Sequence, residues 1–375
     1  MLIFVPIVNA CSWSYLIWGI RTRPADPLFR FVRNGKAGYI DSSGKVVIKP
    51  TLPKGDTSGG EFHEGLVGIK DEKGYRYMSR TGTVVFRTDA WLAFDFSEGL
   101  APAARYGGSS KDKLHQWGFI DRTGGFAIAP QYYWADPFSE GLARVSVSRE
   151  VGSTGYIDRQ GSFKIPAGLA YGSSFHEGLA AVILSGPCRI TNGGSCGRPE
   201  FKPTQPNATY DCRYAFIDKS GSPVSELRFD DAQDFSEGVA AIRVGANWGF
   251  VDRSGQISIS PKFEFAEPFS DGLAAVRQNG RAGFIDHSGN FVIAPQFESV
   301  DSFSDGRALI SESNTDGSQV YRFIDKEGKP AFRGSFNAAA SFSYGLAHVA
   351  LSGRSKGTSA WINTSGKAVF TYVGQ

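Results

Sequence analysis

The feature that most constrains this chain is one segment of sequence that recurs nine times along its 375 residues. The clearest copy contains Trp248-Gly249-Phe250-Val251-Asp252 and continues to Phe269-Ser270-Asp271-Gly272-Leu273. Self-similarity with a period of ~34–42 residues indicates a repeat architecture, in which neighbouring units bury one another's apolar faces. A residue that recurs in every copy is therefore explained first by what the unit needs in order to fold.

Two landmarks define each copy. The first is an apolar run that ends in Asp-x-x-Gly, with Ser79 and Asn363 replacing Asp in two copies. The second is Phe-x-acid-Gly. The turn glycines are Gly44, Gly82, Gly124, Gly161, Gly221, Gly255, Gly289, Gly328 and Gly366. The phenylalanines of the second landmark are Phe62, Phe96, Phe138, Phe175, Phe235, Phe269, Phe303 and Phe342.

The chemistry of these landmarks predicts strands joined by turns. Asp at the first turn position can accept hydrogen bonds from backbone N–H groups two residues on, and Gly adopts positive φ at the fourth position. This spacing predicts a hairpin closed by a glycine bulge. The strand after the turn is expected to stop at a Pro, such as Pro130 or Pro295, because Pro cannot donate to a ladder. A third strand, such as 272–277, precedes the hairpin.

We therefore predict an all-β chain, built as a tandem array of about nine antiparallel meander units of three to four strands. The crossover 296–303 is expected to supply a short fourth strand. Two arrangements fit, an open solenoid or spiral and a β-propeller-like ring. The period approaches that of propeller blades, but nine units exceed the common blade number. The two chain ends also share the same phase, which offers no strand exchange, so the open array is slightly favoured.

These residues resemble the WG-repeat family, also called KWG repeats, which are bacterial proteins built of tandem Trp-Gly-containing β units. The resemblance is carried by Trp117-Gly118-Phe119-Ile120-Asp121 and Trp248-Gly249-Phe250-Val251-Asp252, and it spans roughly residues 28–371. The family brings no agreed catalytic residues, and the resemblance implies an interaction or envelope-associated repeat protein. Copies that depart from the name are Ala282-Gly283, Thr154-Gly155, Tyr214-Ala215 and Tyr321-Arg322.

The chain divides into an apolar segment, residues 1–24, and a repeat array, residues 25–375. The apolar segment is an export signal, a short membrane anchor or the remnant of a longer signal. Cys11 lies in a faint lipoprotein cleavage box. We expect an exported or envelope-associated protein with a membrane tether through this segment, and a monomer. The net charge of +3 is spread without a basic run, which argues against a nucleic-acid partner.

An insertion at residues 183–213 contains three of the four cysteines, Cys188, Cys196 and Cys212. Two of them are expected to form a disulfide, because no Cys-x-x-Cys or neighbouring His supports a zinc site. The third cysteine is then free or pairs with Cys11. The connectivity stays open at the level of sequence.

Titratable residues follow the repeat and offer no unique set. One Asp per turn is too few oxygens for calcium, so these Asp residues are interpreted as turn formers. The acids of Phe-x-acid-Gly are expected to cap backbone amides or to lie at the solvent edge. His63 and His176 occupy the slot of Ser97 in another copy, which predicts an exposed, tolerant position. No catalytic residue, metal ligand or cofactor is predicted.

Functional residues should break the period, and two loops do so, 105–116 and 185–213. The longer loop offers a candidate partner surface. Its candidate residues are Arg189, Arg198, Phe201, Tyr210 and Arg213. The sequence thus favours a non-catalytic binding scaffold of the bacterial cell envelope, with a protein or polysaccharide partner. The alternative is a glycan-acting hydrolase with carboxylates at one face of the array.

Overall fold

The structure is a computed structural model that describes residues 26–53, 60–71, 74–106, 115–184, 188–191, 200–203, 212–351 and 357–374. Every helix or strand assigned in these ranges is a β-strand. Across the same ranges, no helix has the length and apolar character that crossing a membrane would require. The all-β prediction is therefore confirmed for the described part of the chain.

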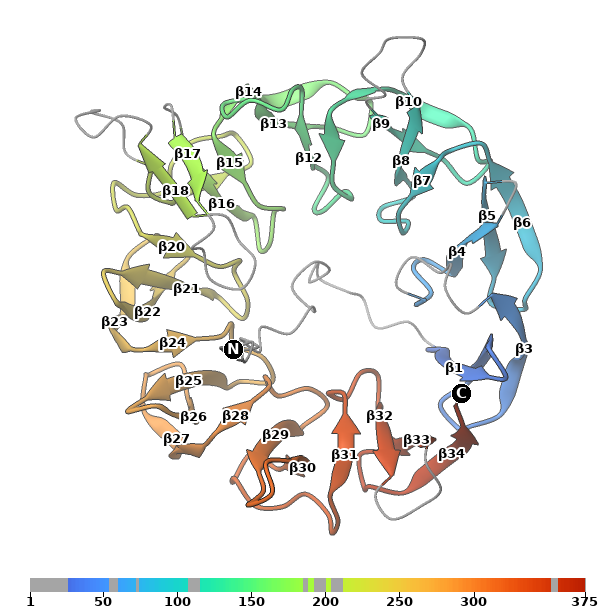
Figure 1. Cartoon of the computed structure of the whole chain (residues 1–375). Coiled ribbons are helices and arrows are strands. Elements are labelled where there is room, and N and C mark those ends of the chain that lie inside the picture. Colours follow the sequence, from blue (N-terminus) through green and yellow to red (C-terminus); the bar gives the residue numbers. More distant parts are fainter. Residues whose placement is uncertain are drawn as a thin grey trace, which may run out of the picture.

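The strands form nine repeat units that follow one another around a ring (Figure 1). Units 1 and 2 contain β1 (Phe29–Arg33), β2 (Lys36–Ile40), β3 (Val46–Pro53), β4 (Leu66–Asp71), β5 (Gly74–Ser79) and β6 (Val84–Thr88). Units 3 and 4 contain β7 (Leu92–Ala93), β8 (Ala101–Tyr106), β9 (His115–Ile120), β10 (Phe126–Tyr132), β11 (Trp134–Ala135), β12 (Ala143–Ser146), β13 (Thr154–Ile157) and β14 (Phe163–Leu169).

The second half of the ring continues in the same order. Units 5 and 6 contain β15 (Tyr171–Gly172), β16 (Leu179–Ile183), β19 (Ala215–Asp218), β20 (Asp231–Ala232), β21 (Val239–Val244), β22 (Asn247–Asp252) and β23 (Ile257–Phe263), and the insertion forms a separate hairpin of β17 (Cys188–Thr191) and β18 (Glu200–Pro203). Units 7 to 9 contain β24 (Phe265–Ala266), β25 (Ala274–Gln278), β26 (Arg281–Ile285), β27 (Phe291–Phe297), β28 (Ser299–Val300), β29 (Ala308–Ser313), β30 (Gln319–Ile324), β31 (Phe336–Ala339), β32 (Leu346–Leu351), β33 (Thr358–Asn363) and β34 (Ala368–Val373).

Each complete unit is an antiparallel meander, as predicted. In unit 6 the order is β20-β21-β22-β23, and the register pairs Ala241 with Phe250 and Phe250 with Ile259. The crossover does supply a short strand, but this strand pairs with the unit that follows, as β28 pairs with β29. Figure 1 places these short strands toward the centre of the ring and the fourth strands, such as β10 and β23, at its rim.

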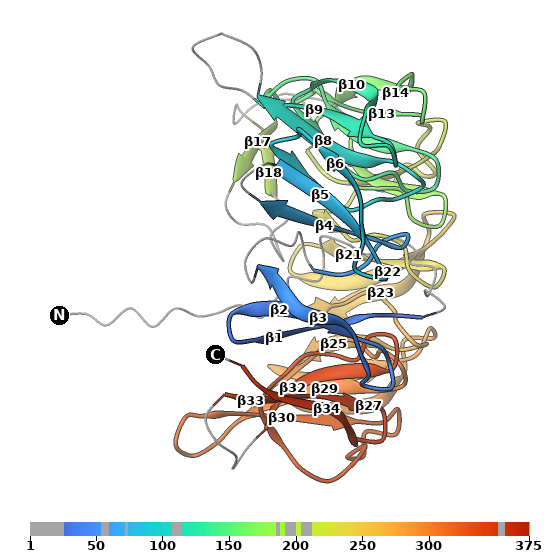
Figure 2. The ribbon, with the colours of Figure 1, turned by 90° about the vertical axis from the view of Figure 1, so that its right-hand side faces the viewer.

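The slight preference for an open array is wrong, because the first and last units pack together and close the ring (Figure 1, Figure 2). Phe29 and Phe31 of β1 share an apolar cluster with Leu346 and Tyr372 of unit 9. The indole Nε1 of Trp361 also donates to the carbonyl oxygen of Arg30 at 3.2 Å. As the shared phase of the ends predicted, unit 1 forms its own sheet, separate from that of unit 9. Side-chain packing, without strand exchange, closes this propeller-like ring.

The expectation that Pro ends the outer strand is also wrong. In unit 6, β23 continues through Pro261 in a bulge, because the register between β22 and β23 shifts between Trp248/Phe263 and Phe250/Ile259. The bulged backbone lies against Gly249, where a Cβ atom would be 2.4 Å from the carbonyl oxygen of Ile259. Such close approach of two backbones requires glycine. The same clash is found at Gly38, Gly118, Gly155 and Gly283, each opposite a Pro-containing strand.

The core consists of a series of clusters between neighbouring units. One cluster joins Trp248, Phe250 and Phe263 of unit 6 to Phe269 and Ile285 of unit 7. Each meander thus covers the apolar face of the next one, as the repeat predicted. Figure 2 shows the ring from its side, with the hairpin β17-β18 on the face that Figure 1 turns toward the viewer.

Candidate functional site

The Asp before each turn forms that turn, as predicted. The Oδ1 atom of Asp252 accepts hydrogen bonds from Ser254 Oγ at 2.6 Å, Ser254 N at 2.9 Å and Gln256 N at 3.1 Å. These bonds, the one from the Ser254 hydroxyl above all, lower the pKa of the Asp252 carboxyl. Asn363 accepts the equivalent bonds in unit 9. Among the described residues no group of His, Cys, Asp and Glu side chains could hold a metal ion.

The acid of Phe-x-acid-Gly links each unit to the next. Glu237 adopts a left-handed backbone conformation (φ 54°), and its Oε2 atom accepts a hydrogen bond at 3.0 Å from the backbone N–H of Gly272 in the following unit. The expectation that this acid caps a backbone amide is confirmed, and the amide belongs to the neighbour. The equivalent pairs are Glu64–Gly99, Glu98–Gly141, Glu140–Gly178, Glu177–Gly238, Asp271–Gly306 and Asp305–Gly345.

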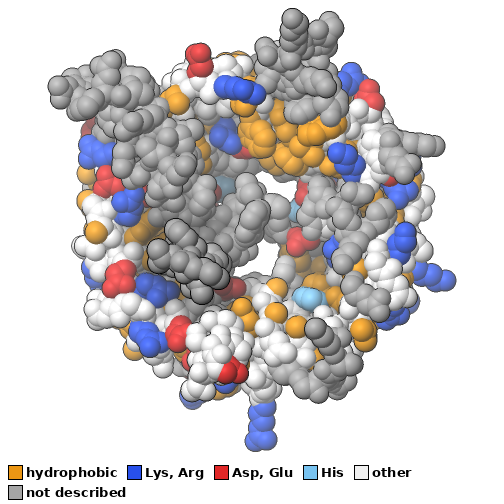
Figure 3. Space-filling view, in the orientation of Figure 1, with side chains coloured by type: hydrophobic (Ala, Val, Ile, Leu, Met, Phe, Trp, Pro, Cys, Tyr) orange, Lys and Arg blue, Asp and Glu red, His pale blue; other side chains and the backbone are white. Residues whose placement is uncertain are grey.

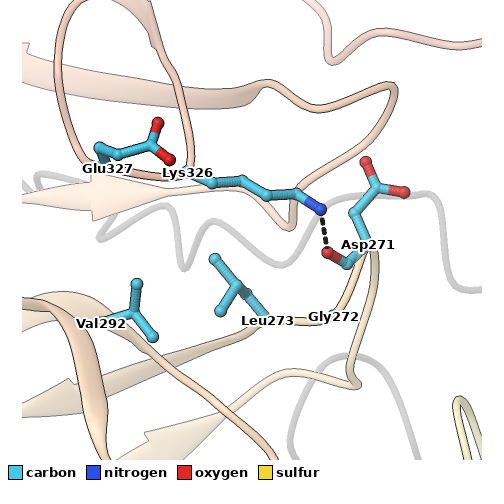
Figure 4. A pocket seen from close by; sticks show the side chains of 6 residues that line it. All are labelled: Asp271, Gly272, Leu273, Val292, Lys326 and Glu327. Atoms are coloured by element: carbon cyan, nitrogen blue, oxygen red, sulfur yellow. Dashed lines mark hydrogen bonds between the residues drawn. The ribbon is translucent and has the colours of Figure 1, made fainter.

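The residue directly after the turn Asp contacts the Phe-x-acid-Gly segment of the preceding unit. Arg253 donates to the carbonyl oxygen of Glu177, and Arg122 donates to Glu64 Oε2 at 2.9 Å. Lys326 donates to the carbonyl oxygen of Asp271, beside a cavity of about 540 Å³ whose base includes Leu273 (Figure 4). This cavity lies between the turn of unit 8 and the acid-containing segment of unit 7. It belongs to the repeating contact between units.

The slot shared by Ser and His is a further contact between units, so its predicted exposure is wrong. Ser236 Oγ donates to the carbonyl oxygen of Phe269 at 2.7 Å. His176 is buried, with 6% of its surface exposed, and its Nε2 atom lies 3.7 Å from Asp234 of the next unit. His63 makes the equivalent contact with Asp95 at 3.2 Å. The sequence contained an indication of this contact. Asp stands directly before the landmark Phe only in the two units that follow the units with His63 and His176.

A carboxyl pair that sequence reasoning missed lies just before the landmark Phe of units 7 and 8. Burial raises the pKa of Glu267 to about 8, and the charge of Asp301 adds to this effect. Burial also raises the pKa of Asp301, while a hydrogen bond from Ser341 Oγ at 2.6 Å opposes the change. This slot, two residues before the landmark Phe, varies between units, and it holds Gly60, Phe94, Asp136, Ser173, Gln233, Glu267, Asp301 and Ala340. Such variation at a fixed position was the available signal.

An aromatic cluster lies between units 3 and 4. The rings of Phe94 and Trp117 stack with centroids 5.0 Å apart and planes at 26°, and Trp117 and Trp134 have centroids 5.0 Å apart. Trp117 is buried, whereas Trp134 and the adjacent Tyr133 are each 36% exposed. Figure 3 shows hydrophobic side chains gathered over the sector between β9 and β13, on the face that is turned toward the viewer. We call Phe94, Trp117 and Trp134 the aromatic platform.

Polar groups at the edge of the aromatic platform hold its exposed ring. The indole Nε1 of Trp134 donates to Asp136 Oδ1 at 2.6 Å, and Nε of Arg144 donates to Asp136 Oδ2 at 2.5 Å. The guanidinium carbon of Arg149 lies 5.5 Å from the centroid of the Tyr133 ring. The platform therefore combines a fixed aromatic surface with hydrogen-bonding groups at its edge.

The architecture and the Trp-Gly strands described above agree with a comparison of the sequence with known families. The family described as WG containing repeat matches residues 38–75, 117–148, 155–186, 214–248, 248–281 and 283–315, which together make up more than half of the chain. The chain belongs to the WG-repeat family. This result confirms the resemblance inferred from the Trp-Gly segments.

The fold of this WG-repeat protein is shared by a solved structure that matches nearly the whole chain. The crystal structure of a eukaryotic initiation factor has a TM-score of 0.62 at 11% identity, and the match covers 92% of this chain and 95% of that one. Kluyveromyces lactis Hsv2 matches with a TM-score of 0.36 at 11% identity, over 60% of this chain and 71% of that one. The WD40 domain of Toxoplasma gondii coronin matches with a TM-score of 0.32 at 10% identity, over 74% and 69% of the two chains. No curated protein sequence matches.

The predicted partner loop of the WG-repeat protein is only partly described. Arg189 lies on β17, paired with Lys202 of β18, and Phe201 lies opposite Ile190 in the same hairpin. Arg213 is exposed next to Cys212, which is buried and disulfide-bonded. The side chain of Cys188 is outside the described part, as are residues Arg198, Tyr210 and Cys196. A shared partner surface and the disulfide connectivity both stay predictions.

Proposed function

We propose that this WG-repeat ring is a non-catalytic binding scaffold of the bacterial cell envelope, which holds a protein or glycan partner on the face that carries Trp134. One observation carries the proposal. The aromatic platform presents a fixed, exposed indole at the surface, whereas the recurring acids, serines and turn residues bond the units to one another. Exposed aromatic side chains held by a rigid scaffold are typical of recognition surfaces.

Binding without turnover is the expected behaviour of the full-length protein. The purified chain is applied to immobilised peptidoglycan, to neutral polysaccharides and to a set of envelope proteins, and both its retention and the release of reducing sugar ends are measured. Retention without release supports the scaffold. A lack of retention on every surface would overturn the proposal.

The envelope location is supported by two features. Residues 1–24 are apolar enough for an export signal or anchor, and Cys212 is disulfide-bonded, a state that persists in oxidising compartments. Fractionation of cells that express the full-length chain is expected to place it with the envelope, with Cys212 protected from thiol reagents. A cytosolic chain with a reactive Cys212 thiol would overturn this location.

The second candidate, a glycan-acting hydrolase, is favoured by one observation. Glu267, with its pKa raised to about 8, is protonated at neutral pH, as a general acid must be, and it lies close enough to Asp301 for their charges to interact. Release of reducing ends that is abolished by Glu267→Gln, but not by the landmark substitution Glu237→Gln, would establish this activity. It would overturn the non-catalytic proposal.

A further inference from the structure

We propose that the aromatic platform binds a neutral hexopyranose unit of a polysaccharide, which stacks on the exposed face of Trp134 and hydrogen-bonds to the pair Asp136 and Arg144. This inference deepens the proposed function, because it names the ligand class and the residues of the binding face. It is carried by the geometry of the platform and by the way in which this sector departs from the repeat.

The exposed indole is held in place before any ligand arrives. One edge is fixed by the hydrogen bond from Nε1 to Asp136, and the ring packs against Trp117 and Phe94 with centroids 5.0 Å and 6.0 Å away. Asp136 is itself fixed by Arg144. A ligand therefore meets a surface whose side chains have already lost their rotational freedom, which lowers the entropic cost of binding.

The platform matches the two kinds of surface on a pyranose. One face of such a ring presents C–H groups, which are apolar and weakly positive, and the face of an indole is apolar and weakly negative. The rim of the sugar presents hydroxyl groups that must exchange water for other hydrogen-bond partners. Asp136 uses two of its roughly four acceptor positions within the protein, and Arg144 uses one of its five N–H donors on Asp136.

The charges of this edge favour a neutral ligand. The side chains of Asp136 and Arg144 are 20% and 18% exposed, and they form an ion pair at 2.5 Å. Because the two charges compensate each other, the pair attracts neither an anion nor a cation strongly. A nucleic acid would also need clustered cations, and the net charge of +3 is spread over the chain.

The packing of the rings disfavours two other ligands. An aromatic cage for an alkylated ammonium group needs rings arranged around an empty space, and here the three centroids lie within 5.0–6.0 Å of one another. A proline-rich peptide binds in grooves between separate aromatic ridges, whereas this platform offers one exposed indole backed by the other two rings.

The same place between units 6 and 7 has Glu267 in the slot of Asp136 but lacks the exposed indole and the arginine, so it supplies an internal control. Trp248 and Phe265 occupy the positions of Trp117 and Trp134, with centroids 5.6 Å apart. Ala275 stands where Arg144 stands in unit 4. This slot holds an arginine in units 1 and 4, as Arg30 and Arg144, and in the other units it holds Gly68, Pro102, Ala181, Ala241, Ala275, Leu309 and His348. The combination of Trp134, Asp136 and Arg144 is therefore particular to unit 4, as is expected of a functional site.

The test measures binding of the full-length protein to cellohexaose, chitohexaose and maltohexaose by calorimetry and by tryptophan fluorescence. At least one of the three is expected to bind. Trp134→Ala should weaken that binding by at least about tenfold, since stacking and apolar burial are both lost. Asp136→Asn keeps acceptor and donor groups and should weaken it less. The matched control Phe265→Ala should leave the affinity unchanged, and near-ultraviolet circular dichroism checks that each variant is folded.

Three results would overturn the inference, and they separate it from the proposed function. Sugar binding that is lost in Arg213→Ala and kept in Trp134→Ala would place the sugar site near Arg213 and contradict the inference. The proposed scaffold function would still hold. Binding of a proline-rich peptide in place of all three sugars, lost in Trp134→Ala, would make the platform a protein-binding site. No binding of sugars, peptides or envelope components would remove both the inference and the proposed function.

Discussion

The contact between units 6 and 7 differs in kind from the contact that closes the ring between units 9 and 1. Between units 6 and 7, Glu237 accepts from the N–H of Gly272 and Ser236 donates to the carbonyl oxygen of Phe269, beside a large apolar cluster. At the closing contact Tyr344 stands in place of the acid, and unit 1 has no Phe-x-acid-Gly segment. We call these two regions the inner contact and the seam.

At the seam, aromatic packing and the hydrogen bond from Trp361 Nε1 to the carbonyl oxygen of Arg30 stand in place of the acid-to-amide and serine-to-carbonyl bonds. Phe29 lies against Trp361 with centroids 5.1 Å apart, and Phe31 lies against Phe370 at 4.8 Å. The inner contact fixes both the distance and the angle between two units through directional bonds, whereas apolar packing is less directional. Residues that recur in the repeat therefore make the contact between successive units. The contact that closes the ring depends instead on side chains found only in the first and last units.

The largest expected effect comes from removing one buried ring in each region. Phe250→Ala at the inner contact and Phe31→Ala at the seam both empty fully buried positions, and such truncations cost about 3–5 kcal/mol. We expect Phe250→Ala to lower the urea midpoint of the whole ring. Phe31→Ala should instead open the ring, because fewer directional bonds hold the seam, and small-angle scattering should report a larger radius of gyration.

The comparison fails if the two variants behave alike. A Phe31→Ala protein that keeps the wild-type radius of gyration and loses as much global stability as Phe250→Ala would show that the seam is an ordinary contact between units. The conservative variants Phe31→Leu and Phe250→Leu serve as controls, since each retains most of the apolar volume.

The second effect concerns alkaline pH at the contact between units 7 and 8. The pKa of Glu267 is raised to about 8 in the folded protein by burial and by Asp301. The folded state therefore holds this proton where the unfolded chain releases it, so the contribution is complete below about pH 4.3 and is lost as pH rises toward 8. Glu267→Gln should flatten the fall of the urea midpoint between pH 5 and 8.5. An unchanged pH profile in this variant would contradict the assignment.

The sequence predicted the elements of one unit more completely than the contacts between units. The turn at Asp252 and the strands on either side of it follow from local chemistry and strand periodicity, and both are confirmed. The bulge at Pro261 was missed because it depends on the close approach of Gly249 on the neighbouring strand. The sequence of the Pro-containing strand alone does not show this contact. Ring closure also depends on the rotation between successive units, which adds up over nine units. This rotation cannot be recognised in the sequence of a single repeat.

The sequence analysis stated where functional residues should be sought, but it did not name the residues of the aromatic platform. We expected functional residues to break the period, and the proposed site residues Trp134 and Arg144 lie outside the two loops that the sequence singled out. Trp134 starts a two-residue strand of the kind expected in the crossover, but the pairing of this strand with the unit that follows was clear only from the sheet order. The stacking of Phe94 on Trp117 joins residues of different strands, which hydrophobic periodicity alone does not bring together.

A smaller effect is expected from one directional bond of the inner contact. Glu237→Ala leaves the N–H of Gly272 without its protein acceptor, and because the site is exposed, water replaces part of the loss. We expect a cost of about 1 kcal/mol in the free energy of unfolding, measured by urea titration. Glu237→Gln retains an acceptor oxygen and should cost less. Equal losses in both variants would show that the charge of Glu237, beside His287, matters more than the hydrogen bond.

The smallest effect is expected at the seam in acid. His348 Nε2 lies 2.8 Å from the hydroxyl of Tyr372, and burial lowers the pKa of the His348 imidazole below its usual value. The unfolded chain therefore binds a proton at a higher pH than the folded ring does. The contribution of neutral His348 is complete above about pH 6.5 and is lost as pH falls below that value. Scattering at pH 5.0 and 7.5 should show a slight opening of the ring in acid, which His348→Gln abolishes. Glu267 loses its contribution in the opposite direction of pH and cannot cause this response. An acid-induced opening that persists unchanged in His348→Gln would show that a group other than His348 makes the ring sensitive to acid.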